Sequence, residues 1–260
     1  MRSLFNLARR RPEPLRQPVH AEVPELQEAN VAAIYYGRRM GGDFYDFLRV
    51  SRNRLLFGLL DVAGPMDTNR EIVAAAQNTF REVGGELFAG EDGNPAEAMI
   101  ELCLQVNRSI MKAAGRVHAC PVFAGCYDES VGTVVYFNAG HTPGLVRDSG
   151  GVSELPATGL PLGLFSHTTC DASTVFLQPG AALLLVSRGI VEAKCGGQEL
   201  GLDGIKKGLE AASATNSKEL CQGVLQRVQE FMCSPPRHDD VTALALCRNT
   251  AVQALAATGD

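Results

Sequence analysis

Aspartates at the ends of apolar segments are the residues of this sequence best suited to do chemistry. Asp43 follows two glycines, Asp61 ends the apolar run LLFGLL, and Asp239 with Asp240 precedes the run VTALALC. A carboxylate at the end of a buried strand is costly unless a partner compensates its charge. Carboxylate oxygens are the preferred ligands of Mg²⁺ and Mn²⁺, so these sites together predict a divalent cation. Taken singly, each aspartate could instead cap a turn or a helix.

The length and composition of the chain indicate a globular protein with a sizeable core. Its 260 residues exceed a typical domain of about 150, and its contents of 45% hydrophobic and 20% charged residues are near the globular average. The longest apolar run, 181–186, is far shorter than the ~20 residues of a membrane-spanning helix, so we expect no transmembrane segment. The net charge is −5, and five Arg against one Glu in residues 1–20 leave −9 on the remainder. An acidic body disfavours nucleic acid as the main partner.

The cysteines and the N-terminal arm indicate the cellular compartment of the protein. The eight cysteines show neither a C-x-x-C pair nor zinc-ligand spacing, and we interpret them as buried apolar residues of a cytoplasmic protein. The basic arm at 1–20 lacks the long apolar stretch of a signal peptide, so we expect a flexible tail or a weak contact with a membrane surface or partner.

Hydrophobic spacing predicts mostly strands, with two helices early and one late in the chain. We expect strands at 31–36, 43–50, 54–60, 121–127, 133–138, 144–147, 173–177, 181–186 and 240–247, and helices at 69–87, from 94 onward and at 217–232. This order favours an α+β fold with mostly antiparallel sheet over a parallel βαβ fold. We expect one domain at 21–248, between the arm at 1–20 and a frayed tail at 249–260.

Six motifs occur in an order that is typical of one protein family. They are GGDFYDF (41–47), DVAG (61–64), NAGHTPGLV (138–146), GLPLGL (159–164), LLLVSRGIVEA (183–193) and DDVTALAL (239–246). Together they resemble the bacterial sporulation stage II E-type phosphatases of the metal-dependent, protein phosphatase 2C-like (PPM) superfamily. The resemblance spans residues 20–248 and implies two packed, mostly antiparallel sheets flanked by helix pairs, with a two-metal site at one end.

The resemblance also implies which residues hold the metal. Carried onto this chain, the ligands and catalytic residues are Asp43, Asp61 with the Val62 carbonyl, and Asp239. The family has a fourth ligand, an aspartate, at position 188, where this chain has Arg. In addition, Pro65 and Met66 stand where the family has His-Gly.

Arg188 changes the charge balance of the predicted site. Three aspartates bring −3 and Arg188 reduces this to −2, which one divalent ion would balance. A guanidinium ~4.5 Å from a divalent ion, at an effective dielectric constant of ~20, would be repelled by roughly 7 kcal/mol. We therefore expect one Mn²⁺ or Mg²⁺ rather than two. Arg188 either pairs with Asp61 or Asp239 and replaces the other ion, or extends its charge into solvent.

Neighbouring polar residues are assigned supporting roles. Asp46 lies three positions beyond Asp43, which in a regular strand points the two to opposite faces, so we expect Asp46 and Asp240 behind the metal ligands and Arg188 near the substrate phosphate. His141 is expected to fix a turn rather than act as a general acid, and His238 could tune the site. Ser187 lacks the His and Asp partners of a nucleophile.

The resemblance implies a phosphatase acting on phosphoserine or phosphothreonine of a bacterial regulatory protein, such as an anti-sigma-factor antagonist. Two alternatives stay open: a catalytically inactive pseudophosphatase that binds a phosphoprotein or another partner, and a phosphatase of small metabolites. Because Arg188 replaces a ligand, we expect turnover to be attenuated while phosphate binding persists.

Overall fold

The computed structural model describes residues 23–36, 42–62, 66–90, 93–212, 216–232 and 240–250, without the side chains of 66–68. The predicted arm at 1–20 and most of the predicted tail lie outside these residues. The helices are α1 (Met66–Ala89), α2 (Pro95–Ala114), α3 (Arg188–Val191), α4 (Gly201–Ala211) and α5 (Ser217–Phe231). The strands are β1 (Ala29–Tyr36), β2 (Phe44–Arg49), β3 (Arg54–Leu60), β4 (Val122–Asp128), β5 (Thr133–Ala139), β6 (Gly144–Asp148), β7 (Gly151–Leu155), β8 (Ser173–Phe176), β9 (Ala182–Val186), β10 (Lys194–Cys195), β11 (Gln198–Glu199) and β12 (Val241–Arg248).

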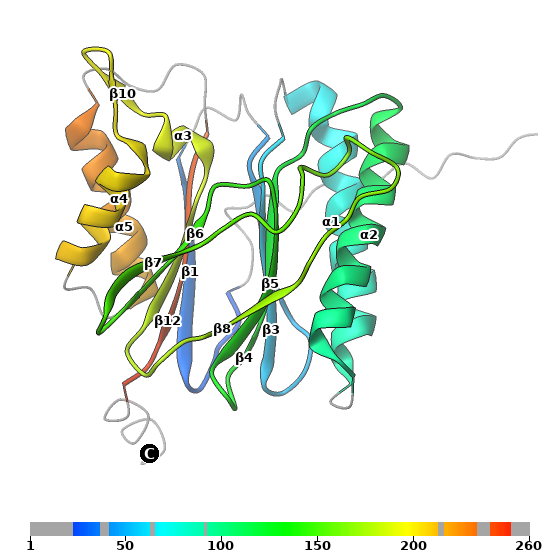
Figure 1. Ribbon diagram of the computed structural model, residues 1–260, viewed down its shortest axis with the longest axis horizontal. Coiled ribbons are helices and arrows are strands. Elements are labelled where there is room, and N and C mark those ends of the chain that lie inside the picture. The colour runs from blue at the N-terminus through cyan, green and yellow to red at the C-terminus, as the bar shows by residue number, and fades with distance from the viewer. Residues whose placement is uncertain are drawn as a thin grey trace, which may run out of the picture.

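Two five-stranded antiparallel sheets pack face to face, with a helix pair on the outer side of each (Figure 1). The first sheet has the order β1-β12-β9-β6-β7 and the second β2-β3-β4-β5-β8. Helices α1 and α2 cover the second sheet, and α4 and α5 cover the first (Figure 1). The predicted α+β fold with two antiparallel sheets and helix pairs is confirmed.

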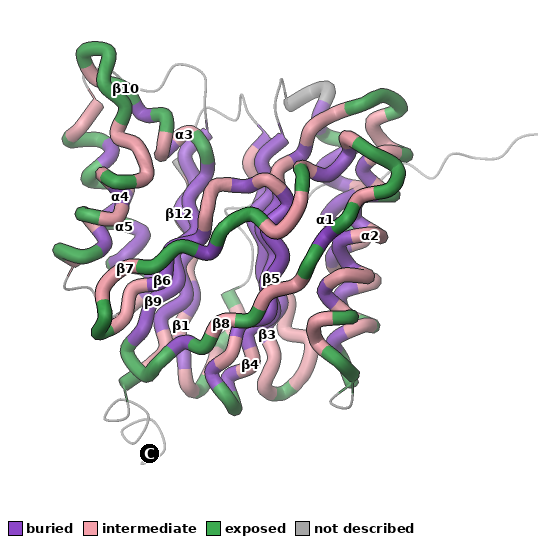
Figure 2. The backbone as a smooth tube through the Cα atoms, in the orientation of Figure 1, coloured by how far each residue is buried: buried purple, intermediate pink, exposed green. Residues whose placement is uncertain are grey.

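Three apolar layers account for this arrangement. One fills the space between the sheets with residues such as Phe57, Phe123 and Leu185, and one lies under each helix pair. Strand β9 is buried along its whole length because it contributes to the layer between the sheets and to the layer under α4 and α5. In Figure 2 most residues of the central strands are coloured as buried, whereas the helices alternate between buried and more exposed residues and many loop residues are exposed.

Local signals define the long helices. Asn94 accepts a hydrogen bond from the Ala96 amide at 3.0 Å, and Pro95 begins α2 where no donor is needed. Gly115 ends α2 in the left-handed conformation, with φ of 63°. Asn216 caps α5 by accepting from the Glu219 amide at 2.9 Å.

Two expectations are corrected. Helix α4 was not predicted, because its glycines obscure the helical pattern. Six cysteines are buried and free, but Cys195 is disulfide-bonded, so the interpretation of all eight as buried apolar residues is wrong for Cys195. No helix in the described part of the chain has the length and apolar character needed to cross a membrane.

Candidate metal and phosphate site

The two sheets present their functional residues at the same end of the sandwich. Asp43 directly precedes β2 and Asp61 directly follows β3, and these strands pair antiparallel with Phe44 opposite Leu60. In the other sheet, β9 leads into Ser187 and β12 begins after Asp240, with Val186 paired to Ala243. The antiparallel pairing therefore brings segments that are distant in sequence to one edge, where the β3 and β9 ends lie near the top of Figure 1.

A hydrogen bond joins the sheets at this edge. Thr242 in β12 donates its Oγ1–H to Asp43 Oδ2 at 2.7 Å. The Thr242 amide donates to Ser187 Oγ at 2.9 Å, and Ser187 Oγ donates to the Asp240 carbonyl at 3.3 Å. Ser187 is fully buried, and its hydrogen bonds connect the end of β9 to the start of β12.

Close backbone packing sets Asp43 beside Asp61. The Val62 amide donates to the Gly42 carbonyl at 3.3 Å. A Cβ at position 42 would lie 2.7 Å from the Val62 Cβ and would overlap the Val62 carbonyl oxygen, so only glycine allows this approach. The Val62 carbonyl also accepts from Asn69 Nδ2 of α1 at 3.1 Å, which leaves a second lone pair on that oxygen.

Asp43 carries the strongest electrostatic signature of the site. Burial, and then the negative charge of Asp61, raise the pKa of Asp43 from 3.8 to about 8. Hydrogen bonds from Thr242 and Ser187 act in the opposite direction, and Asp240 adds a smaller repulsion. Burial is therefore the main reason that the charged form of Asp43 is disfavoured, and the negative charge of Asp61 adds to it.

Arg188 supplies positive charge at the same place. Its Nε lies 3.6 Å from Asp61 Oδ2, and its side chain is 45% exposed. Of the two alternatives for Arg188, the structure has the guanidinium paired with Asp61 while still partly open to solvent.

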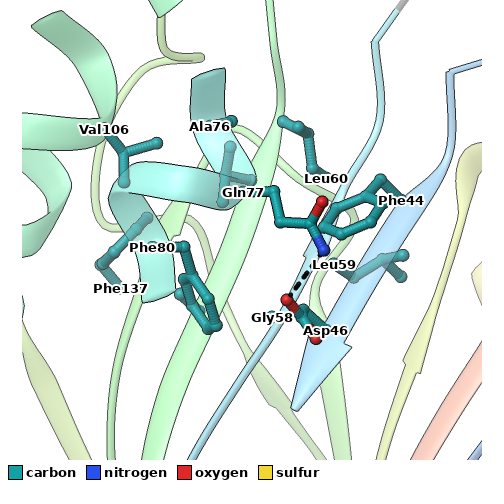
Figure 3. Close-up of a pocket in the computed structure, with 12 residues that line it drawn as sticks. Phe44, Asp46, Gly58, Leu59, Leu60, Ala76, Gln77, Phe80, Val106 and Phe137 are labelled. Carbon is teal, nitrogen blue, oxygen red and sulfur yellow. Dashed lines mark hydrogen bonds between the residues drawn. The ribbon is translucent and has the colours of Figure 1, made fainter. Parts of the chain in front are cut away.

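Asp46 lies on the opposite face of β2 and binds helix α1. Arg81 donates from Nε to Asp46 Oδ2 at 2.6 Å and from Nη2 to Oδ1 at 2.5 Å. Gln77 Nε2 donates to the same carboxylate at 3.3 Å, as Figure 3 shows. A small cavity of 30 Å³ lies beside this cluster, among apolar residues such as Phe44 and Phe80. It belongs to the packing of α1 on the sheet and not to the site around Asp43.

The motif 138–141 forms a turn at the end of β5. The His141 amide donates to Asn138 Oδ1 at 2.8 Å, and the Thr142 hydroxyl donates to the Val186 carbonyl in β9. Burial lowers the pKa of His141 to about 4, so its imidazole is neutral at pH 7. A neutral, buried imidazole in a turn has the positioning role expected from the sequence and is a poor general acid.

Comparison with known proteins decides the family. The family described as Stage II sporulation protein E (SpoIIE) matches residues 52–249. The chain belongs to the SpoIIE family. Among curated relatives, Protein IcfG of Synechocystis sp. is 24% identical over 87% of this chain and 39% of its own length. Phosphoserine phosphatase RsbU of Bacillus subtilis is 22% identical over 87% of this chain and 65% of its own length.

Solved structures share the fold of this SpoIIE-family chain. The SiaA-PP2C domain of Pseudomonas aeruginosa aligns with a TM-score of 0.67 at 18% identity, covering 84% of this chain and 85% of that domain. RsbX in complex with magnesium aligns with a TM-score of 0.62 at 14% identity, covering 86% of this chain and 98% of that one. This SpoIIE-family chain therefore has the fold of a PP2C-type domain. It spans 37% to 65% of the length of the curated relatives that it matches.

The SpoIIE-family site suits a hard divalent cation. Asp43 and Asp61 provide two carboxylates whose mutual repulsion a cation would relieve. The Val62 carbonyl oxygen directly follows Asp61 in the chain and packs against Gly42, the residue before Asp43. No cluster of three or more His, Cys, Asp or Glu residues with metal-binding geometry occurs within the described ranges. The predicted ligand Asp239 and its neighbour His238 lie outside those ranges, and the adjacent Asp240 is buried.

Sequence reasoning missed one contact of this SpoIIE-family site and two contacts behind it. It assigned no role to Thr242, although the motif DDVT contains it, because a threonine in a strand is ordinarily a packing residue. It also did not identify Arg81 and Gln77 as partners of Asp46. Their spacing of four residues on one helix face was the available signal, but nothing local indicates which strand that face meets.

Proposed function

We propose that this chain is a metal-dependent phosphatase domain that hydrolyses phosphoserine or phosphothreonine on a bacterial regulatory protein. The observation that carries the proposal is the placement of Asp43 and Asp61 at one sheet edge, where Thr242 of the other sheet binds Asp43 and Arg188 lies 3.6 Å from Asp61. The raised pKa of Asp43 is in agreement with it. An acidic pair that is forced together attracts a cation and, with the cation, a phosphate. Family membership supports the same reading. We further propose a cytoplasmic location and, as substrate, a protein such as an anti-sigma-factor antagonist.

Some residues of the proposed site would bind the metal, and others position these metal-binding residues. Asp43, Asp61, the Val62 carbonyl and Asp239 would hold one Mn²⁺ or Mg²⁺ rather than two, and the three aspartates are the residues on which catalysis depends. When bound, such a cation supplies a Lewis acid that acidifies water and neutralises charge on phosphoryl oxygens. Thr242 orients Asp43 through its 2.7 Å hydrogen bond, and Gly42 keeps Asp43 close to Val62. Arg81 binds Asp46 in β2, the strand that directly follows Asp43, and so holds this strand against α1.

Arg188 is proposed to attenuate turnover. Its guanidinium, 3.6 Å from Asp61, adds a charge that opposes a cation at the position where the family has an aspartate. The same guanidinium, partly open to solvent, can bind phosphoryl oxygens in a charge-assisted contact. This contact favours the second candidate function, a pseudophosphatase that binds a phosphoprotein and does not hydrolyse it.

Turnover of p-nitrophenyl phosphate with Mn²⁺ tests both candidates. We expect slow turnover by the native chain, an increase of at least about tenfold in Arg188→Asp, and loss in Asp61→Ala. Asp203→Ala, an exposed aspartate of α4, is the matched control and should change nothing. Equal rates for the native chain and Arg188→Asp would refute the attenuation, and full activity in a folded Asp61→Ala would refute the site. Absence of turnover in both the native chain and Arg188→Asp would favour the pseudophosphatase.

A further inference from the structure

Two loop segments beside the site expose an unusual share of large apolar side chains. The described residues include six exposed large hydrophobics, and three of them lie on these segments: Val117 at 68%, Leu160 at 56% and Phe165 at 56%. Single exposed apolar residues are normal on a protein surface, whereas grouped ones mark an interaction site.

Backbone bonds hold the two segments together. Cys120 and Leu162 exchange hydrogen bonds at 2.8 and 3.0 Å, and the His118 amide donates to the Gly163 carbonyl at 3.3 Å. Val117 directly precedes His118, and Phe165 follows Gly163 by two residues, so both lie at the same end of this short ladder. Leu160 precedes Leu162 by two residues and lies toward the other end of the ladder. We name Val117 and Phe165 the apolar ridge.

Helix α2 fixes the ridge in place. Asn107 is buried and accepts from the Gly163 amide at 2.7 Å, while its Nδ2 donates to the Phe165 carbonyl at 2.9 Å. Gly163, with φ of 81°, packs so tightly that a Cβ would lie 3.0 Å from Ile110 Cγ2. A surface held this firmly loses little conformational entropy when a partner binds it.

The ridge is next to the proposed site. The Asp61 amide donates to the Pro121 carbonyl at 2.9 Å. Burial, and then the nearby charge of Asp61, raise the pKa of Cys120 to about 12. Val117 is four residues from Pro121, a distance of at most ~14 Å along the chain. A standard protein interface of about 800 Å² per partner has a radius of about 16 Å. A folded protein that places a phosphoserine at Asp61 would therefore cover the ridge.

Basic residues lie close to the ridge in the sequence. Residues 107–121 and 156–170 contain three Arg or Lys and no Asp or Glu, although the chain as a whole carries −5. Arg108 and Lys112 are exposed and share one face of α2, and Arg116 follows the end of that helix. This region therefore suits an acidic partner.

We propose that the apolar ridge and these three basic residues dock the protein substrate, by binding an acidic and apolar surface beside its phosphorylated residue. The inference rests on the proposed function, because it assumes that a phosphoprotein is bound at Asp61. In Figure 2 the loops near the upper end of α2 contain residues coloured as exposed.

Binding of designed phosphopeptides tests this docking. The probe is a short fluorescent peptide with one phosphoserine and, about four to six residues away, Leu and Glu residues that an extended chain would bring to the ridge. Val117→Ser with Phe165→Ser should weaken binding about tenfold by fluorescence anisotropy. Val131→Ser with Phe176→Ser, at 55% and 54% exposure on the β4–β5 hairpin and β8, is the matched control and should change binding less than twofold.

Charge reversal provides an independent arm. The variant with Arg108→Glu and Lys112→Glu should bind the acidic peptide more weakly than the native chain does. It should bind a peptide that has Lys in place of Glu more tightly than the native chain does. Equal binding by the native chain and the ridge variant, or equal binding of the acidic and basic peptides to the native chain, would overturn the proposal. If the variant with Val117→Ser and Phe165→Ser lost binding to anionic lipid vesicles but kept peptide binding, the ridge would be assigned to a membrane surface. That result would also overturn the proposal. Turnover of p-nitrophenyl phosphate is recorded in parallel, since a failed phosphatase leaves peptide binding measurable.

Discussion

At the scale of single residues, Asp43 makes the stability of the metal-free protein depend on pH. Its pKa is 3.8 in an unfolded chain and about 8 in the folded one, so the folded state binds an extra proton between these values. Stability is then greatest near pH 4, falls as the pH rises toward 8, and levels off above it. We expect Asp43→Asn, which needs no proton, to flatten this dependence and to raise the free energy of unfolding at pH 8 by at least about 1 kcal/mol.

Denaturant unfolding in EDTA at pH 5 and pH 8 measures this effect of Asp43. The gain in Asp43→Asn should be larger at pH 8 than at pH 5, because the native chain has lost more stability there. Asp203→Asn is the matched control, since that side chain is 90% exposed. A gain that is equal at the two pH values would show that Asp43 titrates normally in the folded protein.

The sequence predicts the members of the site better than their contacts. Asp43 and Asp61 are recognisable because each ends an apolar segment, where an uncompensated carboxylate is costly. The pairing of Arg188 with Asp61 rather than with solvent depends on a side-chain conformation that no sequence pattern specifies. Asp46 points away from Asp43, as the alternation of a strand requires, but its partner Arg81 comes from a helix whose packing is set by the whole core.

At the scale of elements, the contact between α1 and β2 depends on one buried ion pair. Asp46 is 3% exposed, and Arg81 supplies both of its shortest hydrogen bonds. Arg81→Ala would leave a buried carboxylate without its partner and should lower the free energy of unfolding by about 3 kcal/mol. Arg81→Lys should recover only part of this, because an ammonium cannot form the paired contact. Chemical denaturation measures the free energy of unfolding of both Arg81 variants, and Arg70→Ala on the exposed face of α1 is the control. If Arg70→Ala lowered this free energy by the same amount, the proposed role of the Arg81–Asp46 ion pair would be refuted.

The packing of the Gly42 segment on Val62 yields a separate prediction. Gly42→Ala must push these segments apart, so we expect lower stability and weaker Mn²⁺ binding by calorimetry. Gly85→Ala is the matched substitution, because a Cβ in the interior of α1 would have its nearest contact at 3.8 Å, with Leu48 Cδ2. Helix propensity should make Gly85→Ala neutral or more stable by about 0.5–1 kcal/mol. Unchanged Mn²⁺ affinity in Gly42→Ala would show that close packing at this point is not needed for the site.

Elements with a strong local signal were predictable, and those held by tertiary packing were not. The expected helices at 69–87 and 217–232 correspond to α1 and α5, and Asn94-Pro95 marks the start of α2. Helix α4 has three glycines in eleven residues, so its local propensity is poor. It is stabilised by burying Ile205 and Leu209 against the first sheet, and the sequence alone does not reveal that surface.

At the scale of the whole molecule, the site forms only when the two halves of the sandwich meet. Asp43 and Asp61 belong to the sheet that carries α1 and α2, whereas Ser187, Arg188 and Thr242 come from the other half. The apolar layer between the sheets fixes their separation, so the charge at the site is a property of the assembled fold. The net charge of −5 adds a general attraction for cations that does not depend on this geometry.

Metal stoichiometry and thermal stability measure this assembled charge directly. With Arg188 in place, we expect one Mn²⁺ per chain by calorimetric titration, and we expect a second ion when Arg188→Asp restores a carboxylate and removes the guanidinium. Binding to the folded state alone adds about 2.7 kcal/mol at a free Mn²⁺ concentration of 100 Kd, so Tm should rise with Mn²⁺ and fall again with EDTA. Lys194→Asp changes the net charge by the same amount in the β10–β11 hairpin and is the matched control, which should still bind one ion. Two ions in the native chain would show that Arg188 does not displace a cation, whereas two ions in Lys194→Asp as well would show that overall charge sets the count.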